Sequence, residues 1–86
     1  MTPKQFFSLG LEPRDRVIVA LREGDPVEAF FDGYKTFGNH ILRNPYYDLF
    51  PVFRAVSKNG KMLPQSPWKG HGAGEGFWAI TSCRKK

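Results

Sequence analysis

The sequence predicts a mainly β fold, a small, strongly bent, five-stranded antiparallel barrel preceded by a short α-helix. Short segments with apolar residues at alternating positions recur along the 86 residues, and 9 Gly and 7 Pro help to separate them. A short helix followed by about five short antiparallel strands is an order shared by small β-barrels. A chain of this length allows one domain, 1–86, whose small core favours stabilisation by association.

The first ten residues predict the helix. Thr2 is suited to the N-cap, Pro3 to the first helical position, and Gln5 completes a capping box with Thr2. Gly10 ends the segment. The helix is expected to cover the core with one apolar side, formed by Phe6, Phe7 and Leu9.

Residues 16–21 predict the first strand, because apolar side chains alternate and the intervening positions are also largely apolar. A turn over 22–26 leads to a second alternating strand, 27–34. Gly33 inside this strand indicates a bulge or sharp bend, which helps a short sheet to curl. The alternation places Val27, Ala29 and Phe31 on one face and Glu28, Phe30, Asp32 and Tyr34 on the other.

The middle of the chain predicts a third strand over 40–43 and a further strand over 50–57. A Pro-containing break over 44–48 separates them. Pro51 has no backbone N–H to donate, so the later strand is expected at a sheet edge.

Asn59 and Gly60 predict the two-residue type I′ turn of a hairpin, with a short return strand over 61–63. Residues 76–83 predict the closing strand, in which the single cysteine, Cys83, is a small apolar filler. The alternation places Phe77, Ala79, Thr81 and Cys83 on one side of this strand and Trp78, Ile80 and Ser82 on the other. The expected core consists of Val19, Leu21, Phe31, Ile41, Leu42, Val52, Phe53, Phe77 and Ile80.

The charge is distributed unevenly. Residues 1–48 contain six Lys/Arg and seven Asp/Glu, a net charge of −1. Residues 49–86 contain seven Lys/Arg and one Asp/Glu, a net charge of +6, so the whole chain carries +5. A one-sided basic surface attracts polyanions, usually nucleic acid, although a solvated basic surface explains the same composition. With no run of ~18 apolar residues and no apolar leader segment, we expect a soluble, cytoplasmic protein that does not bind membranes.

One segment carries a more specific pattern. It runs Val17-x-Val19-x-Leu21-x-x-Gly24 and continues as Phe31-x-Gly33-Tyr34-x-x-Phe37-x-Asn39-x-x-Leu42. This pattern resembles the first sequence motif of the Sm-like family of small, strongly bent β-barrels, whose strand order is shared with SH3-like barrels. The resemblance covers residues 17–42 and implies a barrel that assembles as an oligomeric ring.

The resemblance also implies a nucleic-acid site. In the family, the residue that matches Phe37 stacks on a nucleobase and the residue that matches Asn39 hydrogen-bonds the base edge. Stacking of this kind is worth ~1–3 kcal/mol per base. A core Phe37 and a turn-forming Asn39 are the structural alternative. The chain departs from the family pattern at Lys35, where a carboxylate usually orients the Asn, and it lacks the family's second motif, an Ile-Arg-Gly.

Loop aromatics beside basic residues point to the same chemistry. Trp68 precedes Lys69, and Tyr46 and Tyr47 stand on the Pro-containing break. Such side chains stack on bases, and they anchor protein partners equally well. The expected nucleic-acid contacts are Lys35, Phe37, Asn39, Arg54, Trp68 and Lys69.

The sequence therefore predicts a non-enzymatic protein that binds single-stranded RNA or DNA as a homo-oligomer. The alternative is a protein-interaction module, or an accessory or inhibitory factor, that uses the same barrel. No activated nucleophile or metal-ligand spacing is recognisable, and no cofactor or metal is expected. The alternating glycines of 70–76 lack the strand-to-helix context of a phosphate-binding loop.

Overall fold

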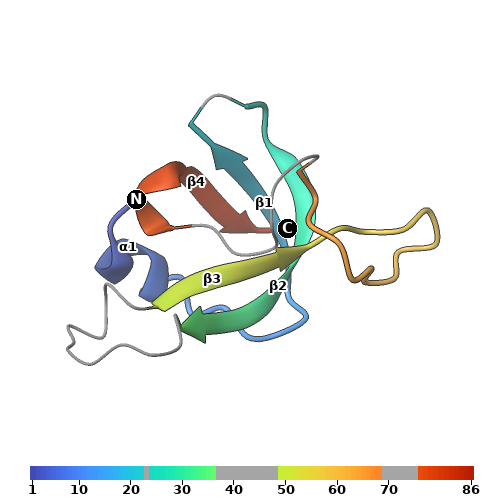
Figure 1. The fold of residues 1–86 in the computed structure, drawn as a ribbon, viewed down its shortest axis with the longest axis horizontal. Coiled ribbons are helices and arrows are strands. Elements are labelled where there is room, and N and C mark those ends of the chain that lie inside the picture. Colours follow the sequence, from blue (N-terminus) through green and yellow to red (C-terminus); the bar gives the residue numbers. More distant parts are fainter. Residues whose placement is uncertain (23, 37–48, 69–75) are drawn as a thin grey trace.

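The computed structural model describes residues 1–22, 24–36, 49–68 and 76–86. Its elements are α1 (Pro3–Phe7), β1 (Arg16–Leu21), β2 (Val27–Thr36), β3 (Leu49–Arg54), the 3-10 helix η1 (Phe77–Ala79) and β4 (Ile80–Lys85). The strands form one antiparallel sheet of order β3-β2-β1-β4, so the last strand returns to pair with the first (Figure 1). The described chain is thus mainly β with one short helix, and its sheet is open, with β3 and β4 at the edges.

The expected five-stranded barrel is confirmed only in its β-rich character and antiparallel pairing. The strand expected over 40–43 lies outside the described residues. The return strand expected over 61–63 supplies a single bridge, between Val56 and Met62. Among the described strands, β3 is the outermost on its side of the sheet, which agrees with the edge position inferred from Pro51.

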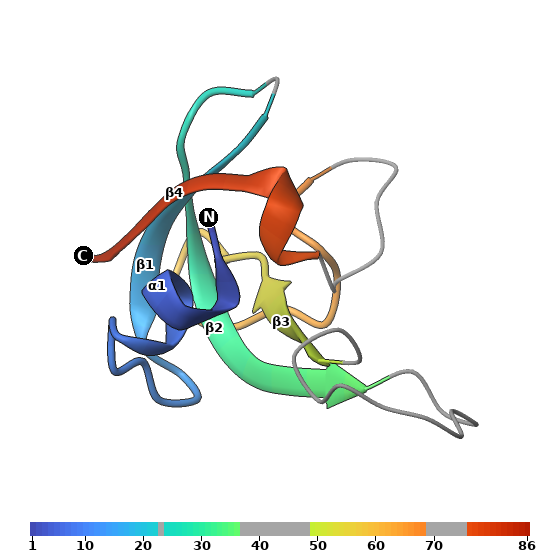
Figure 2. The ribbon, with the colours of Figure 1, turned by 90° about the vertical axis from the view of Figure 1, so that its left-hand side faces the viewer.

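The N-terminal helix forms with the expected capping box. The Gln5 amide donates to the Thr2 hydroxyl at 3.1 Å, and the Thr2 amide donates to the Gln5 side chain at 2.9 Å. Phe6 is fully buried, and its ring lies 5.8 Å from that of Phe31 and 5.5 Å from that of Phe77. Figure 2 shows α1 lying across the sheet, and Phe6 makes this helix a part of the core.

A bulge bends β2, as Gly33 predicted. Gly33 has a φ of 82°, and the pairing with β3 shifts register between Phe31 and Tyr34. Figure 2 shows the strong curvature of this strand. The extra residue reverses the alternation, so the Tyr34 ring turns to the core side and lies 6.1 Å from Phe6. The expectation that Tyr34 shares a face with Phe30 is therefore wrong.

The closing strand differs from the predicted 76–83. Its first part is η1, and β4 itself begins at Ile80. Ile80 and Cys83 are both buried whereas Thr81 is exposed, because the pairing shifts register at the Leu21 end of β1. A bulge of this kind allows two inward side chains to stand three residues apart.

The core agrees with the expected set where the set is described. The residues confirmed as buried are Val19, Phe31, Val52, Phe53, Phe77 and Ile80. Leu21 is half-buried, and Ile41 and Leu42 lie outside the described residues. Four members of the buried cluster are missing from the expected core set: Phe6, Val17, Ala29 and Cys83. Of these, Phe6 was expected to cover the core from the helix and Cys83 to fill apolar space, and both are buried. In the described segments, no helix is long and apolar enough to cross a membrane.

Candidate nucleic-acid interface

The face of the sheet opposite the core carries a row of cations with an aromatic ring at its centre. Phe30 on β2 pairs with Arg16 on β1 and with Arg54 on β3. The Lys86 amide, just beyond β4, donates to the Arg16 carbonyl at 3.0 Å. The Arg16 guanidinium lies over the Phe30 ring, with Cζ 5.2 Å from the ring centroid, which is a cation–π geometry. Strands lie ~4.8 Å apart, so these side chains form a continuous surface.

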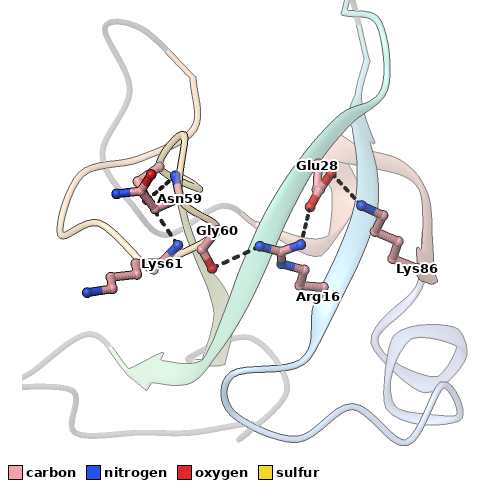
Figure 3. A network of polar contacts seen from close by, with 7 residues as sticks. Arg16, Glu28, Asn59, Gly60, Lys61 and Lys86 are labelled. Atoms are coloured by element: carbon pink, nitrogen blue, oxygen red, sulfur yellow. Dashed lines mark hydrogen bonds and ion pairs between the residues drawn. The ribbon is translucent and has the colours of Figure 1, made fainter.

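Two carboxylates hold part of this row in place. Glu28 forms ion pairs with Arg16 at 3.2 Å and with Lys86 at 2.9 Å, and Figure 3 shows both cations converging on it. Asp32 pairs with Arg54 at 3.0 Å. The hydrogen bond from Lys86, together with the nearby positive charges, lowers the pKa of Glu28. These cations are therefore positioned and partly neutralised.

A hairpin turn over 57–61 lies beside this face. The Ser57 amide donates to the Lys61 carbonyl at 2.8 Å, the Gly60 amide donates to the Ser57 carbonyl at 3.0 Å, and Gly60 has a φ of 81°. This is a three-residue loop, a type I turn followed by a left-handed glycine. The type I′ prediction is wrong, because that turn requires a positive φ at Asn59, which Asn59 does not have.

Arg16 joins the hairpin to the sheet. Its Nη2 atom donates to the Gly60 carbonyl at 2.8 Å, as Figure 3 shows. The contact places the end of the hairpin next to β2 and to the segment that precedes β1. An open depression of about 380 Å³ lies here, lined by Arg14, Phe30, Gly60, Lys61 and Met62.

The depression is cationic. Arg14 and Lys61 are exposed, and neither forms an ion pair with another described residue. Arg14 has a φ of 79°, and it is the non-glycine residue with a positive φ in the described part of the chain. The left-handed region costs a non-glycine residue ~1–2 kcal/mol. The chain therefore keeps a cation at a position where glycine would be less strained.

The described residues among those predicted from the sequence, Lys35, Arg54 and Trp68, do not line this depression. Lys35 is exposed near the end of β2. Arg54 lies on the outer face, where it also donates to the Pro64 carbonyl at 2.6 Å. Trp68 is half-buried, and its ring packs edge-on against Phe53 at 5.6 Å. The remaining three candidates lie outside the described residues: Phe37, Asn39 and Lys69.

Sequence reasoning placed Phe30 on the face that carries Glu28 but did not connect Phe30 with Arg14 or Met62. The alternation of β2 was the available signal for Phe30, whereas nothing local marked the other two residues. In the described ranges, no group of three or more His, Cys, Asp or Glu could hold a metal ion.

Comparisons with protein-family models, with curated proteins and with solved structures find no match for this chain. The geometry and charge of the surface around Phe30 are therefore the observations that bear on function.

Proposed function

We propose that this protein is a non-enzymatic, nucleic-acid-binding protein that holds single-stranded RNA or DNA on the outer face of its sheet. One observation supports the proposal above all: Phe30 lines a depression whose charged lining residues, Arg14 and Lys61, are both cations. Cations bind phosphates and release counterions, and an aromatic ring offers a stacking surface to a base. A surface that combines the two is suited to a nucleotide chain.

Further cations extend this surface. Lys58 is exposed on the same hairpin as Lys61. Arg84 on β4 is exposed and pairs with Ile18 of β1. Arg16 stands two residues before Ile18 on the same strand and pairs with Phe30. A backbone that crosses the strands would thus meet positive charge on both sides of the depression, which favours a chain of phosphates over a single small anion.

Fluorescence anisotropy with a labelled single strand tests the proposal across a range of salt concentrations. We expect the affinity to fall steeply as the salt concentration rises. Lys61→Ala should reduce the slope of the logarithm of the affinity against the logarithm of the salt concentration by about one unit. Lys4→Ala is the control, because Lys4 is exposed on α1, which packs on the opposite side of the sheet, and its slope should equal that of the wild type. Absence of binding at about 50 mM salt, where phosphate contacts are strong, would contradict the proposal.

A second candidate function, a protein-interaction module, is favoured by Trp78. This side chain is 69% exposed, and the Arg22 guanidinium lies over its ring at 5.1 Å. Gly76 leaves room for the indole, because a Cβ there would lie 2.6 Å from Nε1 of Trp78. An exposed Trp held in place by Arg is a typical interface anchor.

Self-association is the form of this second function that can be tested on the purified chain. If a homo-oligomer uses Trp78, light scattering should give a mass above that of one chain, and Trp78→Ala should lower it. An unchanged mass in Trp78→Ala would remove Trp78 from the interface.

A further inference from the structure

We infer that the depression beside Phe30 is a subsite for one unpaired nucleobase, with Arg14 and Lys61 holding the adjoining phosphates. The inference rests on the proposed function and adds the position and chemical nature of the bound unit. Of the residues that line the subsite, Phe30 lies within the segment 17–42 that resembles the family motif. The others, Arg14, Gly60, Lys61 and Met62, lie outside that segment.

The apolar lining requires a ligand with a flat apolar group. Phe30 and Met62 are both half-buried and both line the depression. A phosphate alone would use neither the ring nor the thioether. A base that packs against both would gain the stacking energy that aromatic side chains supply to single strands.

The wall of the depression is held in position before any ligand arrives. Arg16 contacts the Phe30 ring and donates to the Gly60 carbonyl, so one side chain fixes both the ring and the hairpin. The approach depends on Gly60, because a Cβ there would lie 2.6 Å from Nη2 of Arg16. A preformed wall lowers the entropy lost on binding.

The two cations of the lining come from different segments. Arg14 precedes β1, and Lys61 is the last residue of the hairpin turn. The Arg14 backbone is fixed by a 2.7 Å hydrogen bond from its amide to the Phe31 carbonyl. A base in the depression would therefore have a cation on each of two segments available to its phosphates. None of the described lining residues is a carboxylate that would repel them.

The size of the depression agrees with a single nucleotide unit. Its volume of about 380 Å³ lies near the lower end of the ~300–1,000 Å³ found for ligand sites. Bases in a duplex are paired and stacked, so they cannot enter such a site without being extruded. The subsite therefore selects single strands through the base, whereas the cations attract single and double strands alike.

The test compares two labelled single strands of equal length and charge, an oligothymidine and its fully abasic counterpart, in anisotropy titrations. We expect the oligothymidine to bind the wild-type protein about 5- to 150-fold more tightly, because the abasic strand lacks base stacking. Phe30→Leu should largely abolish this difference and leave binding of the abasic strand unchanged. Trp78→Leu is the matched control and should keep the difference.

The outcomes separate the subsite from the proposed function. Equal binding of the two strands by the wild-type protein would overturn the subsite and leave nucleic-acid binding intact. Failure of both strands to bind would overturn both and favour a protein partner. Met62→Ala provides a second variant should Phe30→Leu fold poorly, and it should reduce the preference for the base-containing strand. An unchanged preference in a folded Phe30→Leu protein would also contradict the inference.

Discussion

The Arg16 guanidinium donates a 2.8 Å hydrogen bond to the carbonyl of Gly60, which lies 44 residues further along the chain. The same guanidinium pairs with Glu28 and lies over the Phe30 ring. One side chain thus holds the hairpin over 57–61 against the outer face of the sheet. This contact creates the depression on which the proposed function depends.

The hairpin should be sensitive at Gly60 and tolerant at Lys58. Gly60→Val should destabilise the fold by ~1–3 kcal/mol, because valine resists the φ of 81° and its Cβ would collide with Arg16. Lys58→Ala should change the free energy of unfolding by less than ~0.5 kcal/mol, since Lys58 is exposed. Urea unfolding measures both, and equal effects would show that the turn geometry is wrong.

The two phenylalanines at the centre of β2 should differ in their contributions to stability. Phe31 is 1% exposed within the core, so Phe31→Ala should cost ~3–5 kcal/mol, a large part of the stability of a small domain. Phe30→Ala should cost less, because Phe30 is half-buried on the opposite face. Thermal melting of the two variants checks this expectation. Similar melting temperatures would contradict the assignment of faces.

Arg14 should lower the stability of the fold and strengthen the binding of single strands. Arg14→Gly should be more stable than Arg14→Ala by ~0.5–1 kcal/mol, because glycine relieves the strain of a φ of 79° and loses part of that gain to its greater unfolded-state entropy. Both variants should bind single strands more weakly than the wild type, because both lack the cation. Chemical denaturation and anisotropy measure the two properties. Equal stability of the variants would show that position 14 is unstrained.

Alkaline pH should destabilise the protein through Cys83. Burial raises the pKa of this thiol from 9.0 to about 11. The folded state therefore retains the proton, and the contribution is complete below pH 9 and is lost as the pH rises towards 11. Burial also raises the pKa of Tyr34, so the comparison must be made against Cys83→Ala in the same buffers. We expect Cys83→Ala to lose less stability between these pH values, and parallel losses would refute the role of the thiol.

The features predicted correctly from the sequence are local ones. The capping box depends on residues three apart, and the bend at Gly33 depends on one residue without a side chain. The side on which Tyr34 lies and the replacement of the start of the last strand by η1 were not predictable. Both depend on how the strands pair, and a bulge that reverses the alternation leaves no periodic signal of its own.

The candidate site was predictable only in part. Alternation along β2 correctly placed Phe30 away from the core. The meeting of Phe30 with Arg14, Lys61 and Met62 was not predictable, because it depends on the hairpin geometry and on the bond from Arg16. Contacts between such distant segments have no signature in one sequence.

A two-dimensional ¹H–¹⁵N NMR titration of the protein with a single-stranded oligonucleotide tests the central claim most directly. We predict that the largest shifts fall at Arg14, Phe30 and residues 60–62, which line the depression. Trp78 is an internal control, because it lies near the opposite end of β1, ~16 Å away by the rise of the strand. The absence of shifts around Phe30, or shifts confined to Trp78 and its neighbour Arg22, would contradict the account.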